Sequence, residues 1–195
     1  MKIADTQTKN NLLIAFAAES RAQCRYKSFA DRAIQEGYRR IAEAFKHAAD
    51  REAMHAMCIL DFLGDTEPPV FPEYRPQVAE PTMKNLIAAA REKNHLSTRI
   101  YPQFALLAEL QGLLGIADLF RNLAVAEYWH EETFLELLAE MNETAALDGQ
   151  NPLAWTVAPG FYFDPESDQC SPIVQNDVNS FTLVLSRRID VSEGP

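Results

Sequence analysis

Hydrophobic residues recur every three or four positions in four long stretches of the chain, which is the period of an amphipathic helix. The clearest stretch is centred near residue 50, where the apolar stripe includes Ile41, Phe45, Ala48 and Ile59. The pattern predicts four helices, which run from about residue 8 to a break at Gly37, over 41–62, from about 82 toward Gly112, and from 116 to about 141.

Glycines and prolines predict how these helices connect. Short breaks at Gly37 and Gly112 join the first helix to the second and the third to the fourth, as antiparallel hairpins. Between residues 64 and 81 the chain carries five prolines, which exclude a helix and predict a crossover outside the bundle. One long crossover between two hairpins is the connectivity of ferritin-like bundles. Pro102 is expected to kink the third helix.

The chain changes character after Met141. Residues 144–195 are rich in Pro, Asp and Asn, so we expect an irregular C-terminal extension beside a bundle domain of residues 1–143. Short strands are predicted at residues 160–163 and 181–185. The predicted fold class is therefore all-α, a ferritin-like four-helix bundle with an irregular tail.

The two halves of the predicted bundle repeat each other at a spacing of 75 residues. Glu52 and His55, three residues apart, recur as Glu127 and His130. Other equivalent positions are Tyr26 with Tyr101, Phe29 with Phe104, and Gly37 with Gly112. A duplicated helical pair is the simplest interpretation.

Both Glu-x-x-His pairs lie on the apolar stripe of their helices. Residues three apart share a helix face, so each pair directs an oxygen and a nitrogen at one point. Buried carboxylates and imidazoles need partners, and two facing pairs predict a site for two metal ions. Mixed carboxylate and imidazole ligation favours iron, with manganese as the alternative. The competing interpretation is a buried polar layer with Lys93 as counter-ion to Glu19, Glu52 and Glu127.

Composition narrows the class of protein. A formal charge of -10 argues against binding to nucleic acid or to anionic membranes. No stretch approaches the roughly 20 apolar residues of a membrane helix, and the N-terminus lacks the apolar core of an export signal. The three cysteines form no C-x-x-C pair and fit a reducing compartment. We therefore expect a cytoplasmic protein whose partners are small molecules, metals or other proteins.

Several segments resemble the rubrerythrins. They are NLLIAFAAES at 11–20, Arg25 with Tyr26, EGY at 36–38, ADRE at 49–52, YPQFA at 101–105, AVAE at 124–127, and His130 with Glu131. The resemblance covers about residues 8–143. It implies a ferritin-like bundle with a di-iron centre that reacts with peroxide or dioxygen, and a chain that forms a homodimer.

Position by position, the resemblance also implies roles for individual residues. Glu19 is similar to a terminal metal ligand, Glu52 and Glu127 to bridging ligands, and His55 and His130 to nitrogen ligands. Tyr26 and Tyr101 match tyrosines near the centre of that family and are the candidate catalytic residues.

The third helix departs from the family pattern. Lys93 and Leu96 stand where rubrerythrins have a pair of glutamates, which removes two anionic ligands and adds a cation. Near two divalent ions Lys93 must be deprotonated, point away, or mark a depleted or single-metal site. Alternatively, a helical bulge rotates Glu92 and His95 inward as ligands.

The tail departs from the family pattern as well. Rubrerythrins commonly carry four cysteines after the bundle as an electron relay, whereas this tail carries only Cys170. The relay cannot be built within one chain, so any turnover needs an external electron donor.

Three functions are compatible with these residues. The first is a di-metal oxidoreductase that reacts with peroxide or dioxygen and takes electrons from a separate protein. The second is a repurposed bundle with one ion or none that acts as a binding or assembly protein. The third is a di-iron oxygenase on a small organic substrate, because Leu96 in place of a glutamate leaves apolar room beside the ions.

Overall fold

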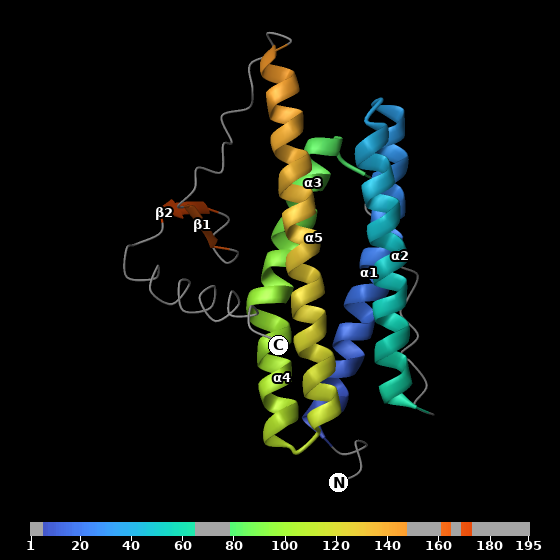
Figure 1. The fold of residues 1–195 in the computed structure, drawn as a ribbon, viewed down its shortest axis with the longest axis vertical. Helices are drawn as coiled ribbons and strands as arrows, with labels where there is room; N and C mark the ends of the chain where they lie inside the picture. The colour runs from blue at the N-terminus through green and yellow to red at the C-terminus, as the bar shows by residue number, and fades with distance from the viewer. Residues whose placement is uncertain (1–5, 65–78, 148–160, 165–168, 173–195) are drawn as a thin grey trace, which may run out of the picture. The chain divides into compact units, whose positions relative to one another are not determined.

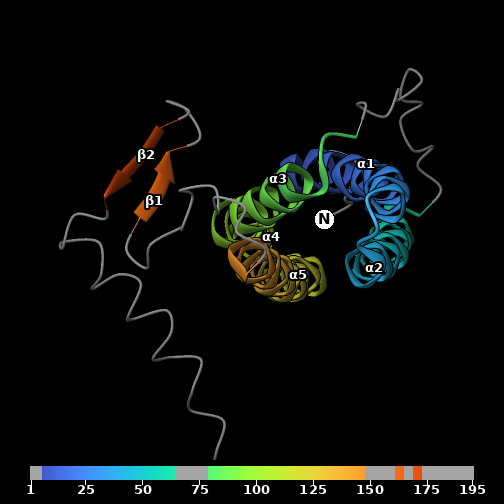
Figure 2. The same ribbon diagram turned by 90° about the horizontal axis from the view of Figure 1, so that it is seen from above.

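The computed structural model describes residues 6–64, 79–147, 161–164 and 169–172. Its helical elements are α1 (Gln7–Gln35), α2 (Arg39–Leu63), α3 (Thr82–His95), the π-helical segment η2 (Leu96–Ile100), α4 (Tyr101–Leu110) and α5 (Leu114–Leu147). Figures 1 and 2 show α3, η2 and α4 as one continuous helix, packed with α1, α2 and α5. The predicted all-α four-helix bundle is confirmed.

Glycine turns close the two hairpins of the bundle. Gly37 and Gly112 have φ of 87° and 73°, in the left-handed region that favours glycine. In both turns the residue after the glycine donates its N–H to the carbonyl oxygen five residues before it, with an N···O distance of 2.8 Å. The repeat therefore extends to the hydrogen bonds of the turns. The predicted crossover lies mostly outside the described residues.

Two hydrophobic clusters fill the bundle, one on each side of a polar layer. The first includes Tyr26, Phe29, Phe45 and Phe134. The second includes Leu12, Ile59, Tyr101 and Phe120. On each helix, buried polar side chains lie in sequence between the residues of the two clusters. The bundle thus encloses these polar groups between two apolar layers.

A π-helical turn lies directly before the position where Pro102 is expected to kink the helix. Pro102 lies in the first turn of α4, directly after η2. Proline lacks an N–H and its ring collides with the carbonyl four residues earlier, so a wider turn before it relieves the conflict. The hydroxyls of Ser97 and Thr98 donate to the Asn94 carbonyl at 3.1 and 2.7 Å and help to satisfy it in this widened stretch.

A short hairpin belongs to a separate compact unit of the chain, Ala145–Pro195. Its strands β1 (Phe161–Asp164) and β2 (Gln169–Pro172) pair antiparallel, with Phe163 opposite Cys170. β1 falls at the first predicted strand, shifted by one residue. β2 was not predicted, because its sequence lacks apolar alternation and pairing with β1 defines it. The predicted strand at 181–185 lies outside the described residues.

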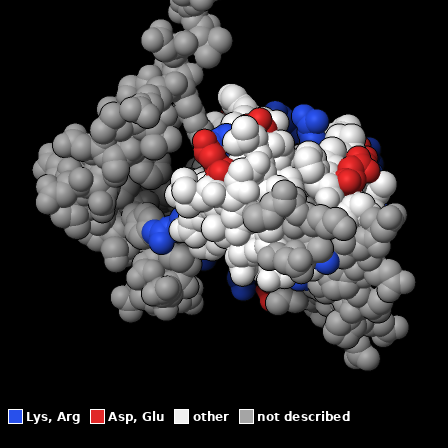
Figure 3. All heavy atoms as spheres, turned by 90° about the horizontal axis from the view of Figure 1, so that it is seen from below, with Lys and Arg blue, Asp and Glu red and all other residues white. Residues whose placement is uncertain are grey.

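Uncharged side chains prevail at the end of the bundle where α4 turns into α5 (Figure 3). Leu110 and Leu114 at this turn are 76% and 61% exposed. The predicted homodimer stays a prediction.

Among the described residues, no helix combines the length and the apolar character that crossing a bilayer requires.

We expect Gly112→Ala to lower the free energy of unfolding by about 1 kcal/mol, because alanine is strained at positive φ. Gly115→Ala is the matched control, since Gly115 is helical and an added Cβ would meet Phe62 at an ordinary 3.6 Å. Urea unfolding followed by circular dichroism measures both. Equal stability of the two variants would contradict the strain argument.

Candidate metal centre

Six charged or titratable side chains from four helices meet in the polar layer. They are Glu19 of α1, Glu52 and His55 of α2, Lys93 of α3, and Glu127 and His130 of α5. The three carboxylates and Lys93 are fully buried, whereas the histidine side chains keep 14% and 12% exposure. The structure therefore brings together the five ligands predicted from the sequence, and adds Lys93.

The Lys93 ammonium group lies among the carboxylates. Its Nζ donates to Glu52 Oε2 at 2.8 Å and forms an ion pair with Glu127 Oε2. Burial disfavours the charged form, but Tyr26 and the carboxylates of Glu127 and Glu52 raise the pKa of Lys93 well above its ordinary value. The alternative that Lys93 points away from the cluster is thus wrong. It is the counter-ion of the acidic cluster.

A second group of donor atoms converges beside the lysine. Single ligand atoms of Glu19, Glu52, His55 and Glu127 all lie within 4.8 Å of one another. His55 Nδ1 is 3.2 Å from Glu127 Oε1 and 3.5 Å from Glu19 Oε2. Two helices supply oxygen ligands around the Glu-x-x-His pair of a third, as the repeat predicts.

Several atoms of this group have no hydrogen-bond partner among the described residues. They are Glu19 Oε2, Glu52 Oε1, His55 Nδ1 and Glu127 Oε1. The close contacts of His55 with its neighbours are short enough but lack hydrogen-bond geometry. Buried ligand atoms without hydrogen bonds are costly, and a cation bound beside His55 would satisfy those of Glu19, His55 and Glu127. The residues present therefore fit one divalent ion at this position.

Burial and neighbouring charges shift the pKa values of the side chains in the cluster. Burial and the Glu127 carboxylate raise the pKa of Glu19 to about 8. Burial also acts to raise the pKa of Glu52, but the Lys93 charge together with hydrogen bonding to Glu19 and His130 lowers that pKa to about 2. Burial opposes charging of His55, yet its contacts with Glu127 and Glu19 raise the pKa of His55 to about 10. Without a metal, Glu19 and His55 therefore hold protons at neutral pH.

His130 lies on the lysine side of the cluster. Its Nδ1 is 3.0 Å from Glu52 Oε1 and 3.4 Å from Glu127 Oε2, the oxygen that also contacts Lys93. The rings of His55 and His130 lie 5.8 Å apart between centroids. The two histidines thus mark two neighbouring positions along the bridging carboxylates.

The bulge in the third helix does not bring its other polar residues inward. η2 begins at Leu96, after Lys93, so the register of α3 up to His95 stays regular. Glu92 forms an ion pair with Arg25, and His95 is exposed. The alternative ligands Glu92 and His95 therefore lie outside the cluster. Leu96 packs into the second hydrophobic cluster.

The two candidate tyrosines have different surroundings despite their equivalent repeat positions. Tyr101 donates its hydroxyl to Glu19 Oε1, and burial together with the Glu19 charge raises the pKa of Tyr101 well above its ordinary value. The Tyr26 hydroxyl is buried without a hydrogen-bond partner in the described chain, and its ring centroid lies 5.6 Å from Lys93 Nζ. Both phenols are neutral. Their catalytic role stays a prediction.

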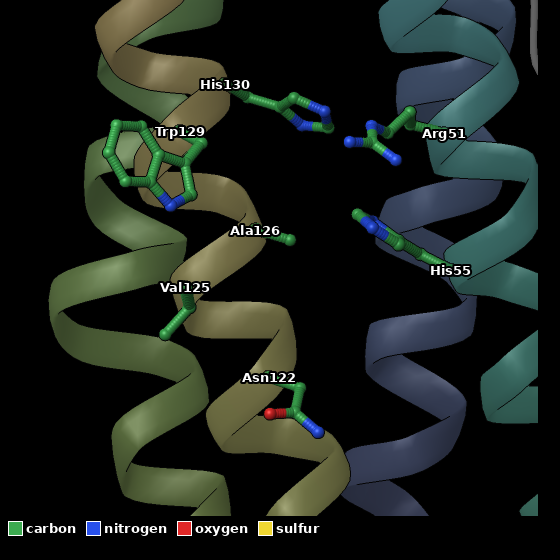
Figure 4. Close-up of a pocket in the computed structure, with 7 residues that line it drawn as sticks. All are labelled: Arg51, His55, Asn122, Val125, Ala126, Trp129 and His130. Carbon is green, nitrogen blue, oxygen red and sulfur yellow. The ribbon is translucent and has the colours of Figure 1, made fainter. Parts of the chain in front are cut away.

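A pocket of about 340 Å³ opens between α2 and α5 beside the histidines. It is lined by Arg51, His55, Asn122, Val125, Ala126, Trp129 and His130. Figure 4 shows Arg51 and His130 pointing toward each other across this space. Arg51 and Asn122 did not stand out in the sequence analysis. For Arg51, spacing was a signal that could have predicted its place in the pocket, because Arg51 lies one turn before His55 on the same helix face.

Comparison with known proteins agrees with the geometry of the site. The sequence profile of the rubrerythrin family matches residues 10–138. A rubrerythrin of Porphyromonas gingivalis is 37% identical over 153 residues, covering 78% of this chain and 76% of the relative. A rubrerythrin of Nitratidesulfovibrio vulgaris is 33% identical over 150 residues, covering 77% and 78% of the two chains.

Two solved structures share the fold. Fully reduced, all-ferrous nigerythrin aligns with a TM-score of 0.65 and 24% identity, covering 89% of this chain and 83% of that one. Reduced symerythrin from Cyanophora paradoxa aligns with a TM-score of 0.63 and 21% identity, covering 72% and 88%. These two likenesses concern the fold.

We expect Lys93→Met to lower the free energy of unfolding of the metal-free protein by about 3–5 kcal/mol, because it leaves buried carboxylates without their cation. Urea unfolding in the presence of a chelator measures the change. Lys84→Met is the matched control, since Lys84 lies on the same helix, is 69% exposed and pairs only with Glu80 at 3.5 Å. A loss in Lys93→Met no larger than in the control would contradict this prediction.

Metal affinity should rise with pH. Binding displaces the protons held by Glu19 and His55, whose pKa values are raised to about 8 and 10. Between pH 6 and 8 the apparent affinity should therefore increase by about tenfold per pH unit for each proton released. Titration with Co²⁺ followed by visible absorbance, repeated across this range, checks the slope. An affinity independent of pH would be inconsistent with protonated ligands.

Proposed function

This chain belongs to the rubrerythrin family of ferritin-like di-iron proteins, and from that premise we propose that it is a metal-dependent oxidoreductase. Its substrate is peroxide or dioxygen, and its electrons come from a separate donor. The observation that carries the proposal is the convergence of unpartnered Glu and His donor atoms on one buried point. Iron is the preferred metal for such a ligand set, with manganese as the alternative.

The protein residues prepare the site for this chemistry. Bound iron supplies the change of oxidation state that passes electrons to the oxygen substrate. Tyr101 holds Glu19 in place through its hydroxyl, and the hydrophobic clusters on both sides keep bulk water out. His55 and His130 separate the carboxylates from the pocket, which makes the α2–α5 side the route for a small oxidant.

Protons and electrons must both reach the cluster. Reduction of one peroxide to two waters takes two electrons and two protons. The Lys93 ammonium holds a proton against Glu52, within the ligand cluster. In this proposal the electrons come from a separate donor protein. The identity of that donor and the cytoplasmic location stay predictions.

The other two functions receive less support. An oxygenase needs apolar room beside Leu96, but Leu96 is only 8% exposed and packs within the second hydrophobic cluster. The repurposed bundle is favoured by Lys93 among the ligands. A bundle that binds no ion leaves the unpartnered ligand atoms beside that lysine unexplained. A bundle that binds one ion without redox chemistry differs from the proposed oxidoreductase in its lack of turnover with peroxide or dioxygen.

Replacing both bridging acids in a Glu52→Gln and Glu127→Gln double variant should abolish tight metal binding. Amides are poor ligands for hard cations, so peroxide or dioxygen consumption with an artificial reductant should fall by at least about 100-fold. Metal analysis and turnover are measured together, with circular dichroism to show that the bundle remains folded.

The matched control for this experiment is a Glu43→Gln and Glu136→Gln double variant, which changes two exposed acids on the same helices, α2 and α5. It should keep its metal and its activity. Turnover by the Glu52→Gln and Glu127→Gln variant equal to that of the control would remove the proposed function.

A further inference from the structure

We infer that the Lys93 amine takes the place of the second metal ion of the cluster, so that this chain binds a single divalent ion. The ion lies on the side of Glu19 and His55, and Lys93 serves as the fixed cation on the side of His130. This inference rests on the proposed metal dependence of the site, but not on its reaction with peroxide or dioxygen.

The bridging carboxylate of Glu127 defines two cation positions. Its Oε1 lies 3.2 Å from His55 Nδ1, within the group of converging ligand atoms. Its Oε2 lies 3.4 Å from His130 Nδ1 and pairs with Lys93 Nζ. One oxygen therefore faces an ion position flanked by His55, and the other faces a position that the lysine already fills.

Both oxygens of Glu52 contact groups on the lysine side of the cluster. Its Oε2 accepts from Lys93 Nζ at 2.8 Å, and its Oε1 lies 3.0 Å from His130 Nδ1. A metal ion bound by both bridging acids and His130 would need the space that Nζ occupies. Two cations cannot share one position between the same two oxygens, because their repulsion in a dry interior is strong.

Charge balance favours one divalent ion. Three buried carboxylates carry three negative charges, and Lys93 contributes one positive charge. One divalent ion balances the three carboxylates and Lys93, with His55 neutral as its ligand. A second ion would leave two uncompensated positive charges in a layer enclosed by hydrophobic clusters, at a high desolvation cost.

The third helix holds Lys93 in this position. On one side of it Glu92 pairs with Arg25 of α1, and on the other Asn94 donates to Glu131 of α5 at 2.9 Å. The Tyr26 ring lies 5.6 Å from the ammonium nitrogen. Because both neighbours in sequence are tied to different helices, α3 cannot rotate about its axis and turn Lys93 out of the cluster without breaking these contacts. It is built into the cluster.

Titration of the full, metal-free chain with Co²⁺ tests the inference. Visible absorbance should saturate at about one equivalent per chain, with element analysis giving the same stoichiometry. In Lys93→Glu a carboxylate replaces the amine, so binding should rise to about two equivalents. Lys84→Glu changes the same charge at an exposed site of the same helix and should remain at about one.

A second variant keeps the test decisive if Lys93→Glu does not fold. Lys93→Met removes the cation but adds no charge, and it should expose a second, weaker Co²⁺ site formed by Glu52, Glu127 and His130. Two tightly bound ions in the unmodified chain, no ion at all, or one ion in both Lys93 variants would overturn the inference. One bound ion without peroxide or dioxygen turnover would sink the proposed function and leave this inference standing.

Discussion

The ion pairing of Lys93 with Glu52 and Glu127 is the interaction on which the rest of the interior depends. Three carboxylates in one buried layer repel each other, and without a cation they would have to take up protons or disrupt the packing. The lysine comes from α3, whereas the acids come from α1, α2 and α5. A single ammonium group therefore joins α3 to α2 and α5 by ion pairs, and the Tyr26 ring of α1 lies 5.6 Å from it.

The polar layer is effective because of what surrounds it. Hydrophobic clusters on both sides exclude water, which strengthens every charge interaction within the layer and makes each unpartnered atom costly. The histidines alone reach the pocket between α2 and α5.

The internal repeat places the two Glu-x-x-His pairs of the site, and the positions at which the two halves differ make the site asymmetric. The Glu-x-x-His pairs remain equivalent, but the repeat aligns Glu19 with Asn94, which donates to Glu131 instead of joining the cluster. The equivalent tyrosines differ as well, since one donates to Glu19 while the other lies against Lys93. Two nearly symmetric halves therefore enclose an asymmetric cluster, with the ligand atoms around His55 on one side and Lys93 on the other.

The sequence alone determined the helices, the glycine turns and the five converging ligands, because helical periodicity and an exact repeat place residues on defined faces. The tertiary structure decided which side chains contact each other, because helical periodicity does not determine contacts between helices. The π-helical turn falls after Lys93 and not before it, so the lysine points inward while Glu92 and His95 point elsewhere. The pocket beside Arg51 likewise exists only once α2 and α5 lie side by side. Which side chain meets which depends on packing between helices, and that information is spread over the whole chain.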